Sequence, residues 1–231
     1  MILFPEFTRC KPERKLQNWI AARMPRTDKF ISSHVEIVPM CVERHADSLF
    51  NVLNNNKKHW LYLPYGPFST LDEFRDWITT TTSINETILY TVCDVDNGYP
   101  LGFFGYRQID LYHGLIEIGH VNFSSALRRT RAASEALYIL LNNVFEHGFR
   151  RCEWRCHASN LASARAAVRL GFKFEGCLRQ AMVVKGYNRD TFVFSLLDSE
   201  WCAIQDGFKK YLSDDNFQLN NIQIRPLSDF T

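Results

Sequence analysis

The fold of this chain is decided by the stretch Ser124–Gly148, SSALRRTRAASEALYILLNNVFEHG. Its second half repeats apolar residues at helical spacing, which predicts a helix with one buried face. Just before that face the sequence gathers three arginines, Arg128, Arg129 and Arg131. Positive charge at the start of a helix is unfavourable to the helix dipole, so the cluster needs a physical explanation.

A phosphate-binding site would provide that explanation. The first N–H groups of a helix have no partner within it, and together with the positive end of the dipole they bind phosphate readily. Arginine adds bidentate contacts, and the small residues Ala132 and Ala133 let a ligand approach the backbone. We therefore interpret Arg128 to Ala133 as a pyrophosphate cradle, with an ordinary solvated basic turn as the alternative.

Strands are predicted on both sides of this helix, by LIEIGHVNF before it and RCEWRCHA after it. A strand, a helix and a second strand in this order form a β-α-β unit. The remaining pattern is mixed α and β around one sheet. Further helices are predicted over 16–24, 41–55, 71–82, 160–171 and 201–212, and further strands over 35–38, 86–98, 100–112, 172–184 and 190–201.

Length and composition limit the class of protein. The chain has 231 residues, a net charge of +2 and seven scattered cysteines. These values favour one domain with reduced thiols and give no argument for nucleic-acid binding. No secretory signal is recognised, and no apolar run reaches the ~18 residues of a membrane span. We expect a cytoplasmic or nuclear protein with an N-terminal extension (1–32), a domain (33–212) and a polar C-terminal tail (213–231).

Four segments together resemble the GNAT superfamily of N-acetyltransferases: EIGHVNF, ALRRTRAASEA, NLAS with LGFKFEG, and RDTFVFSLLDSEW. More narrowly they resemble the branch of the ribosomal-protein N-terminal acetyltransferases, from Val35 to Trp201. The resemblance implies an α+β fold, layered α/β/α, with one mixed, mostly antiparallel sheet, helices on both faces and a central β-α-β cofactor unit. It also implies acetyl-CoA as cosubstrate, an amine or a peptide N-terminus as acceptor, and no metal.

The resemblance assigns a cofactor loop residue by residue. Arg128 and Ala133 match its first and last positions, whereas Arg131 stands where the family usually has glycine. This change matters if the position needs a positive φ; in ordinary helical backbone the arginine itself can reach phosphate. The implied pyrophosphate donors are the backbone N–H groups of Arg129, Thr130, Arg131, Ala132 and Ala133. The strand residues implied to pair with the pantetheine arm are Val121, Asn122 and Phe123.

Glu117 matches a family position for the general base. An ammonium has no lone pair, so a nearby carboxylate must take the proton of the attacking amine. On a regular strand Glu117 and His120 point to opposite faces, so only a bulge brings both into one cleft. We predict His120 as a wall residue of the acceptor site, and an exposed strand carboxylate is the alternative for Glu117. A backbone N–H near Val121 is expected to hold the oxyanion.

The start of the helix at 160–171 supplies two more candidates. Asn160 matches an asparagine that in relatives contacts the pantetheine or the catalytic region, although a helix N-cap explains it equally well. Ser163, one turn later, faces the same cleft or the solvent. Many relatives carry a tyrosine acid where this chain has Ala167, and Tyr187 in the loop KGYNRD is the candidate replacement.

The acceptor wall is expected from KGYNRD and from the aromatic loop HWLYLPYGPF. Trp60, Tyr62 and Tyr65 are its candidate substrate contacts, with core packing as the alternative for Trp60. Cys152 and Cys156 share one strand face but lie ~13 Å apart. That separation is too large for one zinc ion, so no metal site is predicted.

Functions from other classes stay open at this point. One alternative is a GNAT-like module, with Arg131 for glycine and Ala167 for tyrosine, that only binds a coenzyme A ligand. A ribosome- or RNA-associated protein would use the arginines, but LRRTRAAS offers no aromatic residue for stacking on bases. Members of the family often pair, so a homodimer is a further expectation that no residue pattern tests.

Overall fold

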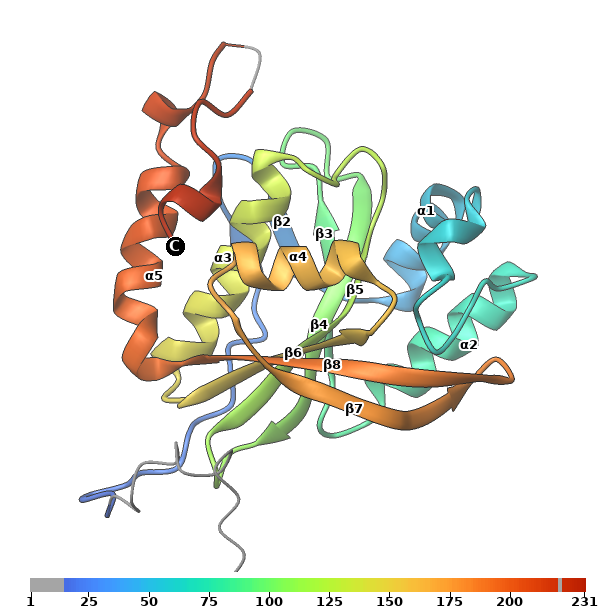
Figure 1. The fold of residues 1–231 in the computed structure, drawn as a ribbon. Helices are drawn as coiled ribbons and strands as arrows, with labels where there is room; N and C mark the ends of the chain where they lie inside the picture. Colours follow the sequence, from blue (N-terminus) through green and yellow to red (C-terminus); the bar gives the residue numbers. More distant parts are fainter. Residues whose placement is uncertain (1–14, 220–221) are drawn as a thin grey trace, which may run out of the picture.

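One sheet with helices on both faces forms the centre of the protein (Figure 1). The computed structural model describes residues 15–219 and 222–231. Eight strands lie in the order β1-β2-β3-β4-β5-β6-β8-β7, and only β5 and β6 pair in parallel. The strands are β1 (Phe30–Ile31), β2 (Glu36–Pro39), β3 (Ile88–Cys93), β4 (Pro100–Asp110), β5 (Leu115–Phe123), β6 (Arg151–His157), β7 (Lys173–Val184) and β8 (Tyr187–Leu197). The predicted fold class is confirmed.

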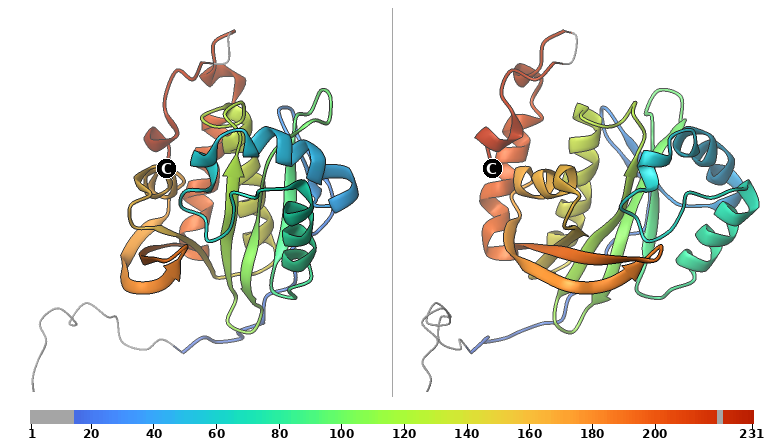
Figure 2. Two further views of the ribbon diagram at one scale, coloured as in Figure 1. Left: turned by 90° about the vertical axis from the view of Figure 1, so that its right-hand side faces the viewer. Right: turned by 45° about the vertical axis from the view of Figure 1, so that its right-hand side comes forward.

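Helices cover the two faces of this sheet in separate groups (Figure 2). They are α1 (Val42–Asn54), α2 (Leu71–Thr82), α3 (Arg131–Glu146), α4 (Leu161–Arg169) and α5 (Asp198–Tyr211), with the short 3₁₀ turns η2 (Lys57–Trp60), η3 (Asp214–Asn216) and η4 (Leu227–Asp229). Side chains alternate along β4, so Phe103 packs with α1 and α2 while Tyr106 donates to the Leu140 carbonyl of α3 (2.8 Å). One strand thus supports both cores.

The β5-α3-β6 unit is parallel over only four residue pairs, from Leu115↔Arg151 to Ile118↔Trp154. Beyond that point β5 stays paired with β4, and β6 stays paired with β8 as far as His157. The two central strands therefore separate, and the second half of β5 has no strand partner on the β6 side.

The loop predicted for KGYNRD is a turn only at its first two residues, and the rest of it belongs to strand β8. Lys185 and Gly186 form its two-residue turn, with φ values of 51° and 82° that are typical of a type I′ turn. The Lys185 ammonium donates to the Trp60 carbonyl (2.7 Å). The two segments predicted to wall the acceptor site therefore meet.

The helix predicted over 16–24 is wrong within the described residues. From residue 15 to 29 the chain runs without helix along the end of the sheet. The Trp19 indole donates to the Tyr112 carbonyl (3.0 Å), and the Ala22 N–H donates to the Leu111 carbonyl (2.9 Å). These contacts with a distant turn replace the local bonds of a helix. Residues 1–14 lie outside the described residues.

The segment predicted as a polar tail packs onto α5 in its described part. Leu227 is completely buried, and the Asn216 side chain donates to the carbonyls of Tyr211 and Arg225. From the start of α3, Arg131 donates to the Leu212 carbonyl and to Asp214. Its guanidinium also lies 4.3 Å from the centroid of the Phe217 ring. The arginine that replaces glycine thus fastens this segment to the domain.

Replacing Arg131 with alanine is expected to lower the free energy of unfolding by about 2 kcal/mol. The change removes a charged hydrogen bond to a carbonyl and a cation–π contact. Asp214→Ala should leave stability unchanged, because that side chain is 91% exposed and solvent screens the ion pair. Urea unfolding of both variants provides the measurement. Equal losses would contradict the assignment of the stabilisation to the carbonyl and ring contacts.

Candidate active site

A pocket opens where β5 and β6 separate. The pocket is partly open to solvent. Of the residues predicted from the sequence it brings together Tyr62, Tyr65, Glu117, His120, Val121, Asn160 and Ser163. Its wall also contains charged and aromatic residues that were not predicted, namely Arg107, Trp154, Arg155 and His157, and it contains Arg189 from the segment KGYNRD that was expected to form the wall.

A β-bulge explains how both candidate residues of β5 reach this pocket. Between the pairs Phe103↔Asn122 and Gly105↔Gly119, β5 advances by three residues while β4 advances by two. His120 lies in this interval with a φ of 55°. The extra residue changes the alternation of side chains. Glu117 and His120 can therefore face the same pocket, for which the sequence analysis required a bulge.

Glu117 is a buried carboxyl, 2% exposed. Its nearest cation is Arg107, whose Nη1 lies 3.5 Å from Oε1. Burial raises the pKa of Glu117, and the attraction of Arg107 and then Arg155 opposes that shift. A base works best when its pKa is near the operating pH. The alternative of an exposed strand carboxylate is wrong, and Glu117 has the environment of a general base.

Gly119 makes room for this pair. A Cβ atom at Gly119 would lie 2.7 Å from Cδ of Arg107 and 3.1 Å from Oε1 of Glu117. Any side chain there would have to displace the arginine. The glycine thus lets Arg107 lie flat across β5 and approach the carboxylate.

A second buried carboxylate, Glu153, lies beside Glu117 on β6 and has a different environment. Its oxygens accept hydrogen bonds from Arg151 (2.8 Å) and Arg155 (2.7 Å). Two close guanidinium groups compensate its charge, whereas Glu117 has one at a longer distance. Glu153 is therefore a structural anion, and it also holds Arg155 at the pocket wall.

His120 and Tyr65 form a neutral polar wall. The Tyr65 hydroxyl lies 2.9 Å from Nδ1 of His120. Burial lowers the pKa of His120 to about 3 and raises the pKa of Tyr65 far above its ordinary value. Neither side chain changes protonation near neutral pH. Their place in the pocket agrees with the predicted role as wall residues.

Two of the residues predicted for catalysis or acceptor binding do not line this pocket. Trp60 is completely buried and packs edge-on against Phe68 and Phe74, which agrees with the alternative that it is a core residue. Tyr187 is 78% exposed at the start of β8, so the structure does not bring the proposed acid into the site. Ala167, at the position of the family's tyrosine, lies in the core. Tyr62 does line the pocket, with its ring 5.4 Å from that of His157.

Asn160 and Ser163 both have a structural role, and Asn160 also has a free polar group. Asn160 Oδ1 caps α4 by accepting from the Ser163 N–H (3.2 Å), and the Ser163 hydroxyl oxygen accepts from the Trp154 indole (3.0 Å). Both residues line the pocket. Among the described residues the amide nitrogen of Asn160 has no acceptor and is left to bind a ligand, whereas the Ser163 hydroxyl also lies against the Cys156 thiol.

The loop before α3 has free backbone donors. Thr130 caps the helix by accepting from the Ala133 N–H (3.1 Å). In the part of the chain that the structure describes, the N–H groups of Arg129, Arg131 and Ala132 have no acceptor within hydrogen-bond distance. The residue with positive φ here is Arg129 (63°), not Arg131, so the lost glycine does not strain the backbone.

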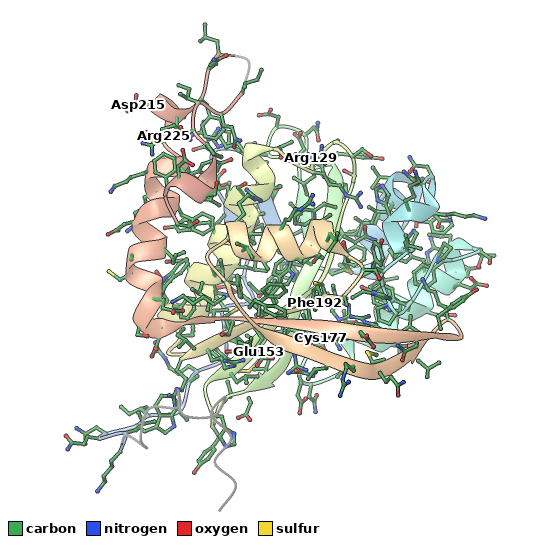
Figure 3. All side chains as sticks on the ribbon, viewed as in Figure 1. Arg129, Glu153, Cys177, Phe192, Asp215 and Arg225 are labelled. Carbon is green, nitrogen blue, oxygen red and sulfur yellow. The ribbon has the colours of Figure 1, made fainter. Side chains whose placement is uncertain are left out.

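The three arginines of this loop do not act alike. Arg131 points to the C-terminal segment, so the predicted contact of its side chain with phosphate is replaced by the contact with Asp214. Arg128 and Arg129 are exposed, and no carboxylate of the described residues lies within 4.0 Å of either. Figure 3 shows Arg129 projecting from the loop. Two arginines therefore remain available to an anion.

The predicted pantetheine strand lies next to this loop. Asn122 is 1% exposed, and its amide has no hydrogen-bond partner among the described residues. Phe123 points into the main core, and Val121 lines the pocket. The free edge of β5 thus connects the pocket with the start of α3.

Among the described residues, no helix is long and apolar enough to cross a membrane, and no group of His, Cys, Asp or Glu suits a metal ion. Cys152 and Cys156 pack in the main core.

Comparison with known proteins identifies the family. The family model for an acetyltransferase (GNAT) domain matches residues 34–173, so the chain belongs to the GNAT acetyltransferases. A probable GNAT acetyltransferase of Chromobacterium violaceum is 50% identical, with a TM-score of 0.81 over 84% of this chain and 98% of that one. A GCN5-related N-acetyltransferase of Brucella melitensis is 36% identical, with a TM-score of 0.89 over 93% and 99%. An uncharacterized N-acetyltransferase, p20, of Bacillus licheniformis is 26% identical over 146 residues, 62% of this chain and 82% of that protein.

More distant structures share the fold and were solved with coenzyme A. A spermidine N-acetyltransferase of Vibrio cholerae, in complex with CoA and spermine, is 17% identical, with a TM-score of 0.62 over 74% of this chain and 99% of that one. A ribosomal α-N-protein acetyltransferase, RimL, is 21% identical, with a TM-score of 0.62 over 72% and 95%. Family membership implies acyltransferase activity for this chain.

The two buried carboxylates are expected to respond differently to replacement. Glu153→Gln should lower the free energy of unfolding by about 3 kcal/mol, because Arg155 loses its anion and Arg151 keeps only Glu175. Glu117→Gln should not destabilise. The raised pKa means that ionised Glu117 costs stability as the pH rises, so the advantage of glutamine should grow upward from about pH 4. Thermal unfolding between acid and neutral pH tests this. A Glu117→Gln loss as large as that of Glu153→Gln would contradict it.

Proposed function

We propose that this GNAT family member transfers the acetyl group of acetyl-CoA to a primary amine, on a small molecule or a peptide N-terminus. One observation carries the proposal. The buried carboxyl Glu117, with its raised pKa, lies in a pocket at the separation of β5 and β6. A module that only binds coenzyme A has no use for such a base.

The residues present fit acetyl-CoA. The free N–H groups of Arg129, Arg131 and Ala132 and the side chains of Arg128 and Arg129 would hold the pyrophosphate. The free edge of β5 from Val121 to Phe123, together with the Asn160 amide, would hold the pantetheine arm. When bound, acetyl-CoA supplies the activated acetyl thioester.

In the proposed reaction Glu117 takes the proton that the amine must lose. The amine nitrogen forms the new N–C bond directly as the C–S bond breaks, with no covalent enzyme intermediate. A backbone N–H on the free edge of β5, near Val121, donates to the carbonyl oxygen as negative charge develops there. The Ser163 hydroxyl, which lines the pocket, is the candidate donor to the leaving sulfur in this proposal.

Calorimetric titration with acetyl-CoA tests the cradle. Saturable binding is expected, and Arg128→Glu/Arg129→Glu should weaken it at least tenfold, because two phosphate contacts become repulsive. Glu117→Gln should bind normally. Arg179→Glu, which changes an exposed arginine on β7, is the charge-matched control. Absence of binding by the parent protein at millimolar acetyl-CoA would refute the proposed function.

The pH dependence of turnover tests the base. The rate should rise with pH through the pKa of Glu117, above its ordinary value of about 4.3, since only the carboxylate accepts a proton. Glu117→Gln should lower kcat by roughly 10²–10⁴-fold. The pH profile also contains the ionisation of the acceptor amine. Measuring two acceptors whose amines differ in pKa separates the two ionisations, because only the one that belongs to the amine shifts from one acceptor to the other. A profile unchanged in Glu117→Gln would exclude this residue as the base.

A further inference from the structure

Arg189 is a buried arginine in the pocket wall that has no carboxylate within 4.0 Å among the described residues. It is 8% exposed, and its one hydrogen bond runs from Nε to the Thr191 hydroxyl (3.3 Å). Burial and then the repulsion of Arg107 lower the pKa of its guanidinium. A buried charge without a counter-ion costs stability, so its persistence calls for a ligand.

The register of the sheet places Arg189 over the separation of the strands. Thr191 pairs with His157, the last residue of β6, and Arg189 lies two residues further out on the same face of β8. It therefore extends past the end of β6, where Arg107 reaches across from β4. Arginines from opposite sides of the separation thus face one pocket.

The charge balance of the wall is positive beside the base. Three guanidinium groups line the pocket, from Arg107, Arg155 and Arg189, against one carboxylate, that of Glu117. Arg155 is held by Glu153, and Arg107 approaches Glu117 at 3.5 Å. Arg189 alone of these three makes no ion pair. Both terminal nitrogens of its guanidinium are left for an anion.

We propose that the acceptor is a small amine that also carries an anionic group, a carboxylate or a phosphate, and that Arg189 binds this group with Arg107 while Glu117 takes the amine proton. The inference rests on the proposed acetyltransferase function of the same pocket. Guanidinium binds carboxylate and phosphate through two parallel hydrogen bonds, so the chemistry fits either anion.

The same arrangement rejects other amines. A neutral amine leaves Arg189 desolvated and unpaired. The loss of this ion pair discriminates between anionic and neutral acceptors far better than a change in apolar contact would. A polycation such as the spermine bound by the Vibrio cholerae enzyme would place positive charge against the arginines. Arg189 is thus the residue that selects the acceptor.

Matched acceptors provide the test, with coenzyme A release measured at saturating acetyl-CoA. An amino acid against its amide tests the carboxylate, phosphoethanolamine against ethanolamine tests the phosphate, and spermidine represents polycations. At least one anionic amine should exceed its neutral partner roughly 100-fold in kcat/KM, with spermidine the poorest acceptor. A neutral or cationic amine used as well as the anionic ones would overturn the inference.

Variants of Arg189 separate recognition from structure. Arg189→Gln should raise KM for the anionic acceptor roughly tenfold or more, change kcat little and abolish the preference, and Arg189→Lys should restore part of it. The melting temperature of Arg189→Gln should equal or exceed that of the parent, because a buried unpaired charge is removed. Arg179→Gln, on the exposed face of the same hairpin, is the matched control and should change neither quantity. A preference retained in Arg189→Gln would overturn the inference.

Binding measurements distinguish failure of the inference about the acceptor from failure of the proposed acetyltransferase function. Failure of the parent protein to bind acetyl-CoA would overturn both. Acetyl-CoA binding with turnover of amines but no preference for anionic ones would overturn only the acceptor class. If no amine in the panel is acetylated, calorimetry of the anionic amines in the presence of coenzyme A decides. Binding by the parent but not by Arg189→Gln supports the inference, and absence of binding overturns it.

Discussion

The separation of β5 and β6 is the constraint on which the rest of this structure depends. Parallel pairing ends at Ile118↔Trp154 because β5 remains bonded to β4, and β6 remains bonded to β8 up to His157. A bulge at His120 turns β5 further. The separation creates the pocket, exposes the free edge of β5 and leads that edge directly to the start of α3. The proposed base, cofactor strand and phosphate loop thus all follow from one interruption of a parallel ladder.

The arginine cluster before α3 illustrates how one sequence motif divides into two functions. Arg128 and Arg129 stay exposed and uncompensated beside the free N–H groups of the helix. Arg131 turns away and fastens the C-terminal segment through Leu212 and Phe217. The departure from the family's glycine therefore does not disturb the phosphate loop. The contacts of Arg131 join that loop to the segment packed on α5, so the proposed cradle and the C-terminal segment stabilise each other.

Much of the fold follows from local pattern, and the site follows only in part. Helical periodicity, the N-caps Thr130 and Asn160 and the strands around α3 were readable because each depends on neighbours in sequence. The helix predicted over 16–24 failed because contacts to Tyr112 and Leu111 outweigh local propensity.

Arg107 and Arg155 were missed for a related reason, and Arg189 was expected only as part of the wall segment KGYNRD, without a role of its own. Arg107, Arg155 and Arg189 come from three strands, and their meeting depends on a register that no local pattern encodes. Tyr187 and Arg189 are only two residues apart, yet one lies exposed at the hairpin end and the other in the pocket. The signal available was the alternation of β8, which places Arg189 on the face of Thr191 and Ser195.

The pocket keeps two opposite buried charges from neutralising each other. Glu117 and Arg189 attract each other electrostatically, yet they make no ion pair within 4.0 Å. Had they paired, each charge would compensate the other, and the guanidinium would offer no site to an anion. Each is instead buried with too little compensation, and both penalties are relieved by one molecule that carries an amine and an anion. In the proposed acceptor class, the instability of the empty site and its selectivity for such a molecule have the same electrostatic origin.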